Sequence, residues 1–142
     1  MTQEELDALP AGEEVDLSGK DLRFRNLSKR VWYGSHFRGA LLSAAGFSES
    51  DLRRCDFSGA VLTHAEFRDA DLTGCNFLGA DMDGVDMEGA ILSGADFSGA
   101  RVRNANLIGC DWRGVTLLGA DFEGSLILPG WAVTRLADDA RS

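Results

Sequence analysis

The side chains with the most potential for chemistry in this sequence are acidic. Seven carboxylates and no lysine or arginine lie between residues 69 and 96. They are Asp69, Asp71, Asp81, Asp83, Asp86, Glu88 and Asp96. Closely spaced carboxylates can attract a basic partner, hold a cation or work as an acid–base pair. Because no signal for an enclosed cleft accompanies them, we expect this acidic segment either to bind a basic protein or to be a solvated surface that keeps the chain soluble.

Histidine and cysteine, the other residues typical of catalytic and metal sites, are few and poorly spaced. His36 and His64 have no partner at the HxxxH spacing or at the spacing of cysteine ligands, so we expect no zinc site. The three cysteines form an odd set without a CxxC pair. Nucleotide-binding and nucleophile motifs are also missing. The sequence therefore predicts a protein that is not an enzyme and needs neither a cofactor nor a metal.

A large apolar residue recurs at every fifth position from Leu17 to Ile127 without a break. A five-residue period winds around an α-helix by roughly 140° per repeat, so it cannot form one buried helical face. In a flat strand, an odd period places successive members on opposite faces. The chain must therefore turn once in every unit, and a chain that turns at short regular intervals forms a solenoid.

The other positions of each unit support this interpretation. The residue two positions before the large one is usually alanine, which suits an inward site with little room. The residue just before the large one is often Asp or Asn, whose side chains hydrogen-bond to nearby backbone in turns. Glycine dominates two positions after it, where it relieves the steric cost of a tight bend.

Units such as residues 70–74, 95–99 and 120–124 resemble the pentapeptide repeat, A-(D/N)-L-x-x, and the resemblance covers about residues 15–128. It implies an all-β solenoid, a right-handed quadrilateral β-helix with one pentapeptide per side and a little under six coils. We therefore predict an N-terminal cap at residues 1–14, the pentapeptide-repeat β-helix at residues 15–128, and a C-terminal tail or cap at residues 129–142.

In such a β-helix, residues twenty positions apart stack directly on one another. The structural core should then contain two columns of stacked side chains, Phe37, Phe57, Phe77 and Phe97 on one side and Leu52, Leu72 and Leu92 on another. We expect a wholly apolar core with no room for a cofactor, so function should lie on the outer surface. Cys55 and Cys75 also stack, and we interpret them as buried reduced thiols, with a disulfide as the alternative.

Both ends of an open β-helix expose unpaired edges and need covers. Thr2 and Glu5 fit a capping box, which predicts a short helix or turn over residues 3–9. Lys20, Arg25 and Arg30 occupy inward sites of the first coil, so either their stems bend over the open end or that coil is irregular. Near the other end, apolar residues favour either a tail folded over the end or a homodimer through the C-terminal coil. These residues are Ile108, Leu118, Leu126, Leu128 and Trp131.

Two functions fit these observations. The first is a non-catalytic protein-interaction scaffold for an unidentified protein partner. The second follows from a resemblance to the quinolone-resistance members of the family, which implies a DNA mimic that binds DNA gyrase or topoisomerase IV, both type II topoisomerases. A duplex would carry about 15 charges over the predicted rod, whereas the net charge of the chain is −9, so mimicry would be incomplete.

The sequence also indicates where the protein works. The chain has no secretory signal and no apolar run of membrane-spanning length, which predicts a cytoplasmic protein that does not associate with a membrane. Six bases lie between Lys20 and Arg38. They lack interleaved exposed aromatic residues beyond Trp32 and Tyr33, so we expect no direct contact with nucleic acid.

Overall fold

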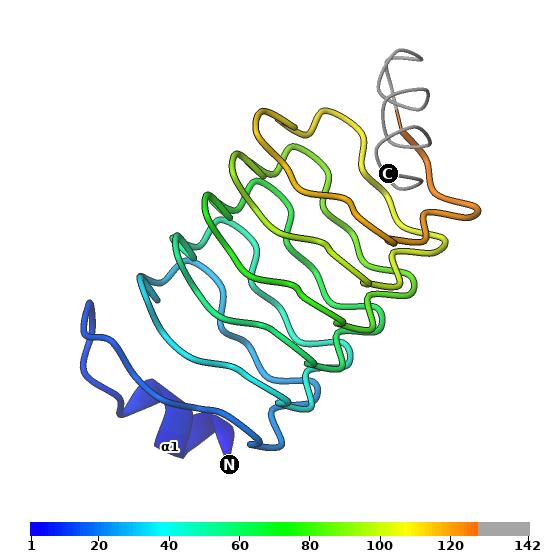
Figure 1. Ribbon diagram of the computed structural model, residues 1–142. Coiled ribbons are helices and arrows are strands. Elements are labelled where there is room, and N and C mark those ends of the chain that lie inside the picture. The colour runs from blue at the N-terminus through cyan, green and yellow to red at the C-terminus, as the bar shows by residue number, and fades with distance from the viewer. Residues whose placement is uncertain (128–142) are drawn as a thin grey trace.

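The computed structural model describes residues 1–127 of the chain. In this part, the backbone winds into a stack of similar coils, and the helix α1 (Gln3–Asp7) lies at the N-terminal end of the stack (Figure 1). Leu128 and Trp131, two of the residues considered for a C-terminal contact, lie outside the described residues. No helix within residues 1–127 is long and apolar enough to cross a lipid bilayer.

Parallel β-bridges set the register of the coils. Each bridge joins residues twenty positions apart, as in Asp16 to His36 and then His36 to Asp56. Within residues 1–127 the bridges are isolated, so each side of a coil contributes one bridge rather than a longer strand. The bridging residue is the one just before the large apolar residue. The structure therefore confirms the stacking of residues twenty positions apart.

A turn ends nearly every side of a coil. The N–H of Ala60 donates to the carbonyl of Phe57 at 3.0 Å, and Gly59 between them has a φ of 65°. Only the third residue of the turn has positive φ, as a type II turn requires. The third side of the first coil departs from this pattern, because the N–H of Arg30 donates to the Ser50 hydroxyl at 3.3 Å. The first coil therefore keeps the register with one altered turn.

The large apolar residues fill the interior. Phe37, Phe57, Phe77 and Phe97 form one parallel stack, with ring centroids 4.9, 5.2 and 5.0 Å apart. A second phenylalanine stack, on the opposite side of the core, packs edge-on against the first. The ring centroids of Phe37 and Phe47, for example, lie 5.5 Å apart. The predicted phenylalanine ladder is thus confirmed. Leu52, Leu72 and Leu92 are also fully buried.

The core is not wholly apolar, and that expectation was wrong. Ser35 and Ser50 are buried at inward sites that usually hold alanine. The Ser50 hydroxyl donates to the carbonyl of Leu27 at 2.9 Å, and the Cys75 thiol donates to the carbonyl of Leu52 at 2.9 Å. A hydroxyl or thiol is therefore tolerated because a backbone carbonyl of the preceding coil lies within hydrogen-bonding distance. Cys55 and Cys75 are free thiols, as the first interpretation predicted.

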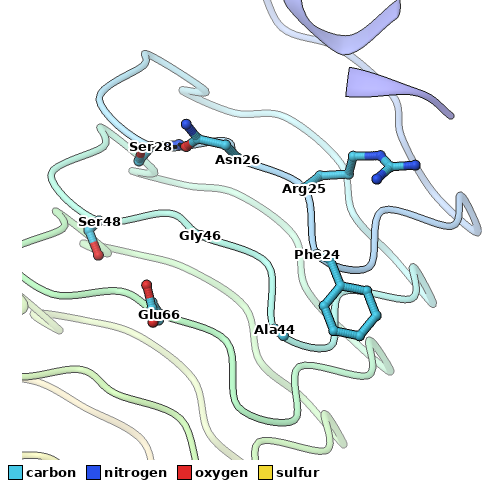
Figure 2. Close-up of a pocket in the computed structure, with 8 residues that line it drawn as sticks. All are labelled: Phe24, Arg25, Asn26, Ser28, Ala44, Gly46, Ser48 and Glu66. Atoms are coloured by element: carbon cyan, nitrogen blue, oxygen red, sulfur yellow. Dashed lines mark hydrogen bonds between the residues drawn. The ribbon is translucent and has the colours of Figure 1, made fainter. Parts of the chain in front are cut away.

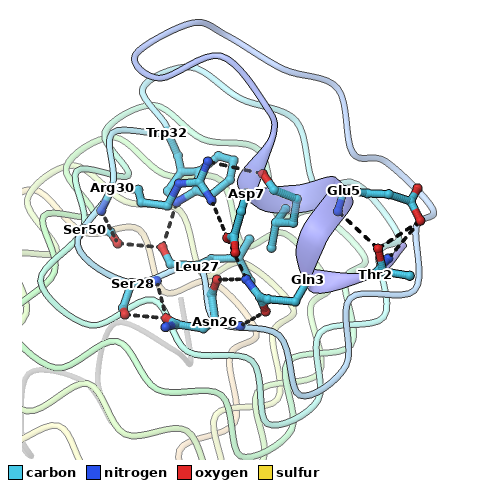
Figure 3. A network of polar contacts seen from close by, with 11 residues as sticks. Thr2, Gln3, Glu5, Asp7, Asn26, Leu27, Ser28, Arg30, Trp32 and Ser50 are labelled. Carbon is cyan, nitrogen blue, oxygen red and sulfur yellow. Dashed lines mark hydrogen bonds and ion pairs between the residues drawn. The ribbon is translucent and has the colours of Figure 1, made fainter.

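The N-terminal segment closes the open end of the stack (Figure 3). The Thr2 hydroxyl accepts from the N–H of Glu5 at 3.1 Å, and the Glu5 carboxylate accepts from the N–H of Thr2 at 3.4 Å. The predicted capping box is therefore present, and within the predicted helix or turn over residues 3–9 the helix itself ends at Asp7. Leu6 of this helix is fully buried against the core.

Side chains also satisfy the exposed backbone edge of the first coil. The Gln3 amide accepts from the N–H of Asn26 at 2.8 Å and donates to its carbonyl at 2.9 Å, which replaces a missing preceding coil. Arg25 donates to the carbonyl of Met1 at 2.9 Å, and Arg30 donates to the carbonyl of Leu6 at 3.3 Å. The two arginines therefore bend over the open end, whereas Lys20 is exposed.

Candidate interaction surfaces

The outer surface has four sides, and we number them by the residues that fill the core behind them. Side 1 contains Phe57, side 2 Leu62, side 3 Phe67 and side 4 Leu72, and each side continues with the residues twenty positions before and after. On every side, the residues just before and just after the buried one face outward. The residue two positions after it forms the corner.

The structure distributes the acidic segment over all four sides. Because one coil takes twenty residues, the run from residue 69 to residue 96 wraps around the rod more than once. Asp96 lies on side 1, and Asp71 lies on side 4 just past the corner that Asp69 occupies. The remaining acids lie on the adjacent sides 2 and 3, and we call them the acidic surface: Asp69, Asp81, Asp83, Asp86 and Glu88. A partner that wraps around the corner between sides 2 and 3 can therefore meet these residues together, but not all seven.

The two outlying acids serve the backbone. The Asp71 carboxylate accepts from the N–H of Thr73 at 3.1 Å and from its hydroxyl at 2.6 Å. The Asp96 carboxylate accepts from the N–H of Ser98 at 2.8 Å. These local bonds explain why Asp and Asn recur just before the buried residue. Asp81 and Asp86 of the acidic surface accept the same kind of bond, from the N–H of Asp83 at 3.3 Å and of Glu88 at 3.1 Å, so only their position on the rod separates Asp71 and Asp96 from the other acids.

An arginine of the neighbouring coil partly neutralises the acidic surface. Arg68 forms ion pairs with Asp86 at 3.0 Å and Glu88 at 3.3 Å. The hydrogen bond to Asp86 raises the pKa of Arg68 above its ordinary value. Arg101 follows Asp81 in the same column of side 2. The sequence did not predict the ion pairs of Arg68, because Arg68 lies just outside residues 69–96.

Not every carboxylate of the acidic surface has a cationic partner. The Asp83 carboxylate accepts from the Asn104 amide at 3.0 Å, and within residues 1–127 it forms no ion pair. The Asp69 carboxylate lies over the backbone of Gly89, where a methyl group would collide with it. Asp69 and Asp83 therefore keep a net negative charge beside the Arg68 ion pairs.

The exposed apolar residues near the C-terminal end do not form one patch. Leu118 lies on side 1 with 56% of its surface exposed, and Leu126 lies on the opposite side 3 with 61% exposed. Ile108 is half-buried on side 3. Leu118 and Leu126 therefore cannot belong to one flat contact, and whether the C-terminal end caps the rod or joins two copies stays a prediction.

A hollow on side 3 was not predicted from the sequence. It has a volume of about 280 Å³ and is lined by Phe24, Arg25, Asn26, Ser28, Ala44, Gly46, Ser48 and Glu66 (Figure 2). We call it the Phe24 hollow. Two departures from the repeat could have indicated it, because Phe24 stands where glycine dominates and Gly46 stands where Asp or Asn is usual.

A second hollow, of about 400 Å³, lies on side 4. Arg53 lines it, but Asp51 holds the guanidinium through hydrogen bonds of 2.8 and 2.7 Å, and the Tyr33 ring lies 5.2 Å below it. The charge of Arg53 is thus already neutralised by Asp51. No group of His, Cys, Asp and Glu residues in the described part of the chain is arranged to hold a metal ion.

Two protein-family profiles match this chain. The profile described as "Pentapeptide repeat region" matches residues 50–127, and the one described as "Pentapeptide repeats (8 copies)" matches residues 21–59. The chain belongs to the pentapeptide-repeat family. Its fold is the pentapeptide-repeat β-helix. A search among curated protein sequences found no match to this pentapeptide-repeat protein.

Solved structures of other pentapeptide-repeat proteins are similar to this one. Rfr23 from the cyanobacterium Cyanothece 51142 has a TM-score of 0.69 and 22% identity, over 79% of this chain and 86% of that one. HetL from the cyanobacterium Nostoc sp. strain PCC 7120, which is involved in the regulation of heterocyst differentiation, has a TM-score of 0.64 and 30% identity. That similarity covers 83% of this chain and 64% of HetL.

QnrB1, a plasmid-mediated fluoroquinolone resistance protein, is more distant. A trypsin-treated form has a TM-score of 0.51 and 16% identity, over 90% of this chain and 89% of that one. At this identity the similarity concerns the fold alone.

Proposed function

We propose that this pentapeptide-repeat protein is a non-catalytic scaffold that binds a basic protein partner through the acidic surface of sides 2 and 3. The observation that supports this proposal is the convergence of five carboxylates on two adjacent sides of a rod whose interior is filled by its own side chains. Backbone bridges fix every coil relative to the next, so presenting these groups costs little conformational entropy on binding.

Charge reversal tests the proposal. In the variant Asp83→Lys with Glu88→Lys, recovery of the partner in a pull-down from cell extract should fall about tenfold, because complementary charge steers and stabilises the encounter. Glu4→Lys with Glu13→Lys is the matched control, since it makes the same change in net charge at two exposed residues of the N-terminal segment. Equal recovery with both variants would contradict the role of the acidic surface.

A narrower form of the proposal names the partner as a type II topoisomerase, either DNA gyrase or topoisomerase IV. The net charge of −9 and the acidic surface support it. The ion pairs of Arg68 make the surface less uniformly charged than a duplex. If the partner is a type II topoisomerase, the protein should inhibit gyrase supercoiling at micromolar concentration. It should also form a homodimer through the C-terminal coil. A monomer in sedimentation experiments that leaves supercoiling unchanged would contradict it.

A further inference from the structure

Phe24 is unusual in both its exposure and its backbone. Its side chain is 77% exposed, the largest fraction among the large apolar residues that the structure describes. Its φ is 63°, in the left-handed region that bulky residues rarely adopt. The ring thus gains little from burial and sits on an unfavourable backbone. Seven other non-glycine corners that the structure describes share this φ, so it is the bulk and exposure of the ring that single out Phe24 as a candidate contact residue.

Gly46 opens the hollow beside this ring. It lies in a bridging column between Asn26 and Glu66, both of which carry outward side chains. The backbone does not require glycine here, because φ is not in the left-handed region and a methyl group would meet no atom within 4 Å. The missing side chain, rather than a turn, therefore creates the space.

The polar groups around the hollow favour a cation. The Glu66 carboxylate is exposed and has no hydrogen bond or ion pair within residues 1–127. Arg25 cannot neutralise it, since its guanidinium points toward the N-terminal segment and donates to the carbonyl of Met1 at 2.9 Å. In Figure 2, Phe24 lies at one end of the hollow and Glu66 at the other, with Gly46 between them.

We propose that the Phe24 hollow receives an arginine or lysine side chain of a basic protein partner. The cation would pack against the ring of Phe24 and reach the carboxylate of Glu66, which joins a cation–π contact to an ion pair. The negative charge argues against a phosphate backbone as the occupant. The inference rests on the proposed function, because Glu66 is bridged to Asp86 of the acidic surface and the hollow shares side 3 with part of that surface.

A tetra-arginine peptide is the probe for the test. Titration into the full-length, ¹⁵N-labelled protein should shift the backbone amide signals of Ser28, Gly46 and Ser48. Phe24→Gly and Glu66→Gln should each weaken binding at these signals by about threefold, as expected for one exposed cation–π contact or ion pair. Gly46→Asn should abolish the shifts, because it fills the hollow with the side chain found at Asn26.

Glu49→Gln is the matched control for Glu66→Gln. It removes the same charge from side 3 outside the hollow, where Glu49 lies 3.9 Å from Lys29, and it should leave the affinity unchanged. The proposal is overturned if Glu49→Gln and Glu66→Gln have equal effects, if the shifts centre on Asp83 and Glu88 alone, or if a duplex oligonucleotide binds the hollow in place of the peptide.

The two proposals can fail separately. Loss of the peptide signals in Gly46→Asn, together with unchanged pull-down in the Asp83 and Glu88 double variant, would support the hollow and contradict the acidic surface. If instead Gly46→Asn keeps the peptide signals and the Asp83 and Glu88 double variant loses the pull-down, the hollow is contradicted and the scaffold proposal is supported.

Discussion

Single residues at the corners of the coils carry a backbone cost that glycine avoids. Each corner needs a positive φ, and eight described positions meet this requirement with a side chain in place. Phe24 is the bulkiest of them, and the cost is not offset by burial because most of its ring is exposed. A side chain at a corner can therefore lower stability and still serve a function on the outer surface.

Phe24→Gly should raise the free energy of unfolding by about 1 kcal/mol, because glycine accepts the left-handed backbone without strain. Urea denaturation measures this change. The opposite substitution at an unobstructed corner is the control: Gly59 has a φ of 65° and space around it, so Gly59→Ala should destabilise by a similar amount. A less stable Phe24→Gly protein would show that the ring contributes to folding.

The buried thiols make stability depend on alkaline pH. Burial raises the pKa of Cys55 from 9.0 to about 12, and it raises that of Cys75 as well. Because the unfolded chain loses these protons first, the thiol contribution to stability is complete below pH 9.0 and is lost as the pH rises toward about 12.

The free energy of unfolding should therefore fall over this pH range, and the fall should be shallower in Cys55→Ala with Cys75→Ala. Alanine is already the usual residue at this inward position, so the variant should fold. Urea unfolding at several alkaline pH values gives the comparison. Identical slopes in the two proteins would contradict the assignment.

The N-terminal helix acts as an element that closes an edge. Its capping box could be read from Thr2 and Glu5, but its end at Asp7 could not, because helix ends depend on contacts with the surface below. The Gln3 side chain pairs with both backbone groups of Asn26, a role that no local pattern indicates.

Leu6→Ala should destabilise the protein by about 2–5 kcal/mol, since the side chain is fully buried against the first coil. It should also promote self-association through the uncovered edge. Thermal unfolding and size-exclusion chromatography check the two effects. Glu4→Ala, at an exposed position of the same helix, should change neither.

The whole molecule is a stack in which each layer contacts only its neighbours. Phe77 lies between the rings of Phe57 and Phe97, at 5.2 and 5.0 Å, and the rigid backbone above and below cannot collapse into a cavity there. Phe77→Ala should therefore cost about 3–5 kcal/mol, measured by urea unfolding. Phe77→Leu keeps most of the volume and should cost much less. Equal losses would indicate that ring stacking, not volume, dominates.

The amino-acid sequence by itself determined the five-residue period, the buried residues and the stacking at twenty-residue steps. These features depend on steric requirements that every unit repeats, so each copy supports the same conclusion. Only the tertiary structure decided which outward groups meet. Arg68 neutralises Asp86 from the preceding coil, Leu118 and Leu126 lie on opposite sides, and the gap at Gly46 becomes a hollow beside Phe24. The physical reason is that outward side chains have no repeated packing constraint, and their contacts depend on the conformation of each side chain and on its neighbours in adjacent coils.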